Sequence, residues 1–214
     1  MPALKGSLTY ARFFVDGELP ADHRERFLKV VRLRAMRPLE PDDEELERSG
    51  WSKIGEPFVV DLGHDDVFWN EYVNLGFRTD RWKLSPSLVR STLRAAEAAY
   101  LEKKGRERLS RTEKAELKLM VTKKLRRAAE PSTRTIDLSW SLNEGVVRFF
   151  SHASKPGAQM MELFKQTFGL ALVPESPFTL AERVGLEKAQ RSAWQDMEMV
   201  SLAGRRPLDA AAEE

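Results

Sequence analysis

Apolar residues recur at helical spacing between residues 83 and 130, and Lys and Arg occupy most of the remaining positions. Ser85 and Pro86 predict the start of a helix, because serine is a good cap and proline loses nothing in the first turn. The pattern continues to Lys104. Gly105 can then leave the helix with positive φ. We therefore expect a first helix over residues 86–104.

A second helix is predicted directly after this glycine. Ser110 and Glu113 have the spacing of a capping box, and Pro131 ends the pattern. The neighbouring face carries Arg111, Lys118 and Arg126, separated by small residues, so that a rod-like polyanion could approach it closely. The predicted buried stripe of this helix contains Leu117, Met120, Val121, Leu125 and Ala128.

Elsewhere the hydrophobic pattern alternates between strand spacing and helix spacing. It predicts strands at residues 7–15, within 66–82, at 133–141, 146–151 and 170–173, and helices at 21–36, 154–168 and 186–200. The acidic residues 38–50 are expected to form a loop with one short helical turn, followed by a connecting loop around residues 50–57. Since the strands arrive mostly as hairpins, the predicted class is α+β, with antiparallel sheets and a central basic helix pair.

The domain prediction follows from the same pattern. Residues 1–203 are expected to form one α+β domain, either as a single body or as two lobes, 1–82 and 83–185, with a helix after them. Residues 204–214 are expected to be a disordered tail.

The net charge of +2 conceals a strong asymmetry along the chain. Residues 81–130 hold 15 Lys and Arg against 6 Asp and Glu, a net of +9, so the remaining residues carry a net of −7. A charge excess confined to one segment is typical of nucleic-acid binding. The alternative is a solvated helix pair, because Lys and Arg are also good helix formers.

The residues expected to contact DNA are the cations of this segment and of the strand that leads into it. Arg78 and Arg81 are included because they accompany Trp82 at the end of that strand, where they could hold phosphates or stack on bases. A core position is the alternative for Trp82. The predicted set is Arg78, Arg81, Lys83, Arg90, Arg94, Lys103, Lys104, Arg108, Arg111, Lys114, Lys118, Lys123 and Arg126.

The sequence contains few of the residues and motifs that catalytic sites commonly use. There is no cysteine, the three histidines are separated, and no glycine-rich phosphate loop occurs. The enzymatic alternative is a metal-dependent nuclease that uses Asp61, Asp65, Asp66 or Glu71. The acidic residues 38–50 could also bind a metal, repel DNA from one side or simply be solvated. We expect no catalytic residue, no metal and no cofactor.

No stretch has the roughly 18 apolar residues of a spanning helix, and the first ten residues lack the apolar core of a signal peptide. We therefore expect a cytoplasmic protein without a membrane partner. A third functional class remains open, in which the amphipathic helices dock a protein partner or a second copy of the chain.

One colinear set of residues comprises Lys83 to Pro86, Leu109, Thr112 to Lys114, Leu117, Lys118, Ile136, Asp137, Asn143, Gly145, Ser154, Lys155 and Leu170 to Pro174. In its order and spacing this set resembles the recombination-associated protein RdgC family. The chain resembles a shortened form of that family. The resemblance implies a non-enzymatic, nucleoid-associated protein that binds duplex DNA without sequence preference. It also implies a homodimeric ring or clamp around DNA, which limits access of the strand-exchange recombinase.

Overall fold

The computed structural model describes residues 9–196. The chain divides into two compact units, Met1–Pro174 and Glu175–Glu214. The boundary does not lie between residues 82 and 83, because the strands on either side of that point pair with each other along ten residues. The predicted tail at 204–214 lies outside the described residues.

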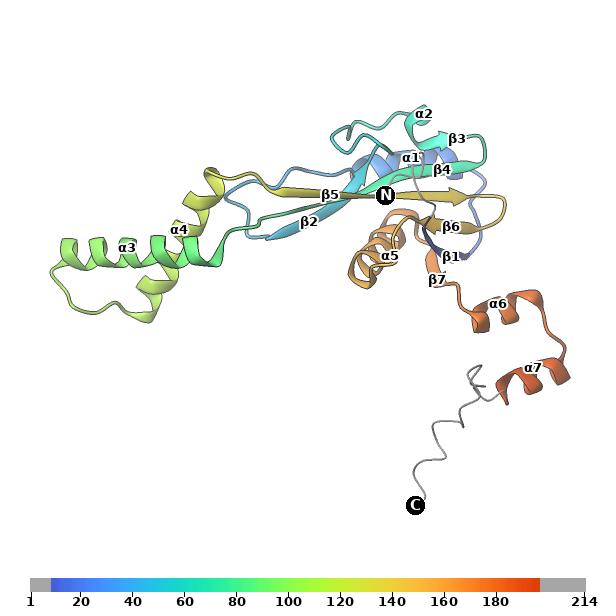
Figure 1. Cartoon of the computed structure of the whole chain (residues 1–214). Coiled ribbons are helices and arrows are strands. Elements are labelled where there is room, and N and C mark those ends of the chain that lie inside the picture. Colours follow the sequence, from blue (N-terminus) through green and yellow to red (C-terminus); the bar gives the residue numbers. More distant parts are fainter. Residues whose placement is uncertain (1–8, 197–214) are drawn as a thin grey trace, which may run out of the picture. The chain divides into compact units, whose positions relative to one another are not determined.

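The first unit contains an antiparallel sheet and five of the described helices, and it confirms the α+β prediction (Figure 1). Its strands are β1 (Ala11–Asp16), β2 (Glu47–Ser52), β3 (Phe68–Trp69), β4 (Tyr72–Arg81), β5 (Ser132–Ser141), β6 (Val146–Phe149) and β7 (Ala171–Pro174). Its helices are α1 (His23–Leu33), α2 (His64–Val67), α3 (Pro86–Lys104), α4 (Arg111–Arg127) and α5 (Ser154–Phe168). The strand order is β2-β4-β5-β6-β1-β7, and β3 pairs with β4.

One face of the sheet carries the core. Side chains alternate between the two faces of a strand, so Phe77 of β4 and Ile136 of β5, which are directly opposite each other, share a face. Both are buried. Helices α1 and α5 cover this face together, because the ring of Phe27 in α1 lies 4.9 Å from that of Phe168 in α5 and 5.5 Å from that of Trp140 in β5.

Most local signals for helix ends and turns are confirmed, although Ser85 precedes α3 without a capping hydrogen bond from its side chain. Gly105 and Gly169 end α3 and α5 with φ of 60° and 72°, and Ser110 with Glu113 forms the predicted capping box. Gly145 has φ of 63° in the turn of the predicted hairpin. Glycine suits each of these positions because it adopts positive φ without steric cost.

The loop prediction for residues 47–52 is wrong, because they form the edge strand β2 along β4. Gly50 of β2 is required by close backbone approach and does not mark a turn: a Cβ placed there would lie 2.6 Å from Cα of Met36. Trp51 follows in the core, where its indole nitrogen donates to Thr167 at 2.8 Å.

The described part of the second unit contains two short helices, α6 (Pro177–Val184) and α7 (Lys188–Gln195). The helix predicted over residues 186–200 is confirmed as α7 in its described part, residues 197–200 lie outside the described residues, and α6 was not predicted. Ser176 and Thr179 form a capping box for α6, with Pro177 at its first position, so the sequence contains a local signal for this helix.

Candidate nucleic-acid interface

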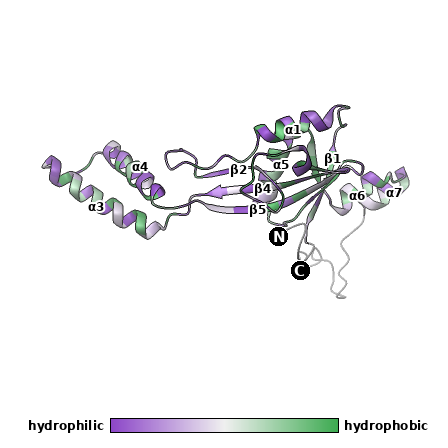
Figure 2. Ribbon diagram, turned by 90° about the horizontal axis from the view of Figure 1, so that it is seen from above, coloured by the Kyte–Doolittle hydropathy of each residue, from purple (hydrophilic) through white to green (hydrophobic). Residues whose placement is uncertain are grey.

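Helices α3 and α4 form a helix pair that lies between β4 and β5 in the chain. The last residue of β4, Arg81, pairs with the first residue of β5, Ser132. Figure 2 shows the two helices side by side beyond the ends of these strands. Leu117 and Val121 are buried in α4, whereas no residue of α3 is buried. The helix pair therefore has a thin apolar seam and exposes most of both helices.

The connection between the two helices is organised around the carboxylate of Glu113. This carboxylate accepts hydrogen bonds from the backbone N–H of Ser110 at 2.8 Å and from the hydroxyl of Tyr100 at 3.1 Å, and Arg106 lies 3.4 Å away. The pKa of Glu113 is lowered, first by the backbone N–H of Ser110. The hydrogen bond from Tyr100 to Glu113 raises the pKa of Tyr100, because the hydroxyl donates to a charged acceptor. Glu113, which belongs to the capping box of α4, thus also holds α3 through Tyr100.

Ten of the thirteen predicted DNA contacts are exposed side chains of this helix pair or of its entry. They are Arg81, Lys83, Arg90, Arg94, Lys103, Lys104, Arg108, Arg111, Lys114 and Lys118. Arg111, Lys114 and Lys118 share one face of α4, because they are three and four residues apart. This arrangement supplies exposed cations on a surface with few competing carboxylates.

The prediction for Arg78 is wrong, because this side chain is buried. Its position on β4 places it on the face opposite Phe77, where it binds both carboxylate oxygens of Asp80, at 2.9 and 2.5 Å. It also donates to the carbonyl of Pro57 at 3.0 Å, and the ring of Phe58 covers it at 4.8 Å. Arg78 therefore stabilises the sheet and has no access to a phosphate.

The prediction for Arg126 is also wrong. Only 5% of this residue is exposed, and its Nη1 donates to the carbonyls of Asp43 at 2.6 Å and Pro41 at 3.4 Å. Its guanidinium lies 5.9 Å from the ring of Trp82, which is itself a core residue. Arg126 joins the end of α4 to the loop before β2, so the face predicted to present Arg111, Lys118 and Arg126 together exposes only the first two.

Asp42 completes this joint from the acidic segment. Its carboxylate binds Arg127 at 2.9 Å and lies 3.6 Å from Lys123, and its pKa is lowered, first by the hydrogen bond from Arg127. Lys123, predicted to contact DNA, is half-buried and paired within the chain. The acidic segment, residues 38–50, therefore holds the C-terminal end of α4 through these ion pairs.

The apolar stripe of α4 is narrower than the sequence predicted. Leu117 and Val121 are buried, whereas Met120 is 64% exposed and Ala128 is also exposed. Leu119 of α4 and Leu88 of α3 are further exposed apolar side chains of the helix pair. The periodicity indicated the helix but could not show that a single neighbouring helix covers it.

Lys124 is an exposed cation of α4 that the predicted set omitted. The charge excess of the segment could have identified it, since Lys124 is followed by Arg126 and Arg127 in the last turn. Arg106 and Arg127 were also omitted, but each is paired with a carboxylate of the chain.

The carboxylates proposed for a nuclease are Asp61, Asp65, Asp66 and Glu71; Asp65 and Asp66 are neighbours in α2, and Glu71 is half-buried between β3 and β4. Asp66 accepts a hydrogen bond from the backbone N–H of Gly63 at 2.9 Å and pairs with Lys53 at 3.4 Å, so it caps α2. Asp65 and Asp61 are exposed. Within residues 9–196, no three His, Asp or Glu side chains are arranged to hold a metal ion.

No helix in the described part of the chain is both long and apolar enough to cross a membrane. A scan against protein-family models finds no match, and a search of curated proteins finds no relative.

Proposed function

We propose that this protein binds double-stranded DNA without sequence preference through the exposed cations of the α3–α4 helix pair. The observation that carries the proposal is the exposure of ten predicted cations there, while the rest of the chain carries a negative net charge. Phosphate contacts give affinity and orientation but read no bases. Binding is therefore expected to be indifferent to sequence.

The resemblance to the RdgC family supports a role in limiting recombination on DNA in the cytoplasm, in association with the nucleoid. It also supports a homodimer. The exposed side chains of Leu88, Leu119 and Met120 favour self-association through the helix pair, because apolar side chains that a single chain leaves uncovered are often buried between chains.

Binding to two duplexes of unrelated sequence across a salt series tests the proposal. With about six phosphates neutralised, log K should fall against log salt with a slope of about −5, and the two affinities should agree within about threefold. A strong preference for one duplex, or no binding at low salt, would contradict it. Loss of DNA ends that requires magnesium and stops with a chelator would favour the nuclease alternative.

A further inference from the structure

Arg81 and Lys83, at the entry to the helix pair, also line a groove on the core face of the sheet. The groove has a volume of about 280 Å³ and lies where β4 and β5 extend past the first turns of α5. Its floor contains the buried side chains of Phe77 and Ile136, and Thr79 lies between Phe77 and Arg81 on the same face of β4.

The cations of this groove come from four segments of the chain. Arg81 ends β4, Lys83 precedes α3, Arg134 lies on β5 opposite Thr79, and Lys155 lies in the first turn of α5. Against them stands a single carboxylate, Glu47 of β2, so the formal charge of the lining is +3. A concave surface with convergent charge of one sign concentrates ions of the other sign.

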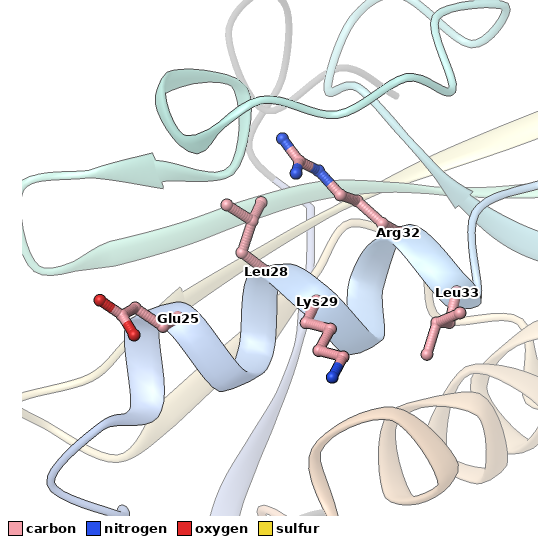
Figure 3. Close-up of a pocket in the computed structure, with 5 residues that line it drawn as sticks. All are labelled: Glu25, Leu28, Lys29, Arg32 and Leu33. Carbon is pink, nitrogen blue, oxygen red and sulfur yellow. The ribbon is translucent and has the colours of Figure 1, made fainter.

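The hollow on α1 provides a contrast (Figure 3). Its lining residues, Glu25, Leu28, Lys29, Arg32 and Leu33, all come from one helix. Their side chains diverge in the close-up, and the guanidinium of Arg32 is already bonded to the carbonyl of Leu62 at 2.6 Å. That hollow offers no set of convergent groups, whereas the groove on the sheet does.

Glu47 occupies part of this positive groove. Its carboxylate accepts hydrogen bonds from Gln159 at 2.6 Å and from Lys155 at 3.0 Å, and Arg81 lies 3.7 Å away. The pKa of Glu47 is lowered, first by the hydrogen bond from Gln159 and then by that from Lys155. Within residues 9–196, neither Lys83 nor Arg134 has a hydrogen bond or an ion pair from its side chain. Two cations therefore remain available in the groove while Glu47 engages the others.

The chemistry of the lining favours a phosphate group as the ligand. Arginine presents a planar fork that matches phosphate oxygens, lysine adds a point charge, and Ser132 adds a hydroxyl donor. The hydroxyl of Thr79 is hydrogen-bonded to that of Ser49 at 2.9 Å. The volume is at or below the lower end for sites that hold a drug-sized molecule, which begin at roughly 300 Å³. It suits one phosphate with its immediate substituent better than a whole cofactor.

We propose that this groove is a phosphate-binding site, distinct from the exposed faces of α3 and α4 although it shares Arg81 and Lys83 with the predicted DNA contacts, and that Glu47 restrains it by holding Lys155 and repelling the anion. The proposal goes beyond DNA binding by the helix pair, because the groove can bind a phosphate whether or not α3 and α4 bind DNA.

Titration of the full chain with inorganic pyrophosphate, followed by backbone amide NMR, tests the site directly. The shifts should be confined to the groove, around Arg81 and Arg134. The double variant R134A/K155A should weaken binding at least fivefold, since two of the four cations are removed. The variant K29A/K165A removes the same charge from exposed positions on α1 and α5 outside the groove, and should leave binding unchanged.

The variant Glu47→Gln gives the sharper result. It removes the one negative charge of the groove but keeps groups that can hydrogen-bond to Gln159, so pyrophosphate should bind about three- to tenfold more tightly. Glu162→Gln changes the same charge on α5 outside the groove and should have no effect. A thermal melt of each variant shows whether it is folded, and K155A alone, at an exposed position, replaces R134A/K155A if the double variant is not. Shifts scattered over α3 and α4, or groove variants that behave like their controls, would overturn the proposal.

Duplexes with 5′-phosphate or 5′-hydroxyl ends then identify the source of the phosphate. A flatter salt slope for R134A/K155A on both duplexes supports internal backbone phosphates, and a loss confined to the phosphorylated ends supports terminal ones. Loss of pyrophosphate binding alone supports a small phosphate compound. Wild-type protein that binds pyrophosphate in the groove but no DNA would refute the function proposed for the helix pair and retain the groove.

Discussion

At the scale of single residues, the role of an arginine on β4 depends on the face of the sheet to which it points. Arg78 and Arg81 are three residues apart on β4, so they point to opposite faces of the sheet. Arg81 is exposed, whereas Arg78 is buried against Asp80. Their types were evident from the sequence. The burial of Arg78 was not, because its cover comes from Pro57 and Phe58, in a loop distant along the chain.

The buried pair of Arg78 and Asp80 predicts a large effect on stability. Asp80→Ala should lower the free energy of unfolding by about 3–5 kcal/mol, because it leaves a buried guanidinium without its carboxylate. The apolar double variant R78M/D80L should lose much less. Chemical denaturation measures both, and equal losses in the two variants would mean that the uncompensated charge is not the cause.

Arg126 gives a second residue-scale prediction. Arg126→Ala should lower the free energy of unfolding by about 1–3 kcal/mol, since the carbonyls of Pro41 and Asp43 lose their donor. It should leave the salt dependence of DNA binding unchanged in the folded protein, because the side chain is buried. Lys124→Ala, at an exposed position of the same turn, is the control and should have little effect on stability. If Arg126→Ala flattened the salt dependence of DNA binding without loss of stability, Arg126 would have to be counted among the DNA contacts.

At the scale of elements, local signals sufficed where a segment is defined by its own residues. Caps, positive-φ glycines and apolar spacing located α3, α4, α5 and the β5–β6 hairpin. The strand β2 was missed because ERSGWS has no clear alternation, and its strand form depends on pairing with β4 and on the approach of Met36 to Gly50. Such long-range contacts are not encoded in a short window of sequence.

The connection between α3 and α4 carries a pH dependence through Glu113. Its pKa is lowered in the folded protein, so its charge contributes stability above the ordinary value of 4.5, and that contribution is lost as the pH falls through the depressed folded value. The difference in Tm between wild type and Glu113→Gln should be largest near about pH 7 and should shrink toward about pH 3. Glu116→Gln, exposed on the same helix, should show no such trend. A difference that stays constant with pH would mean that the charge of Glu113 contributes nothing.

At the scale of the whole molecule, the division of charge follows the division of structure. The sheet and its covering helices bury the aromatic core, while the helix pair buries little and exposes cations. The acidic segment meets the basic one at Asp42 and the carbonyls of Pro41 and Asp43, where Lys123, Arg126 and Arg127 are held. The asymmetry was visible in the sequence. The cations already engaged within the chain could be separated from the available ones only with the structure.

The salt dependence of duplex binding by R111A/K114A/K118A tests the central claim most directly. These three exposed side chains share a face of α4 and leave the buried Arg126 in place. The matched control R26A/K29A/K165A removes three exposed cations from α1 and α5. We predict that the slope of log K against log salt falls in magnitude from about 5 to between about 2 and 3 in the α4 variant and stays near 5 in the control. Equal slopes for wild type and the α4 variant would show that this face of α4 does not contact DNA.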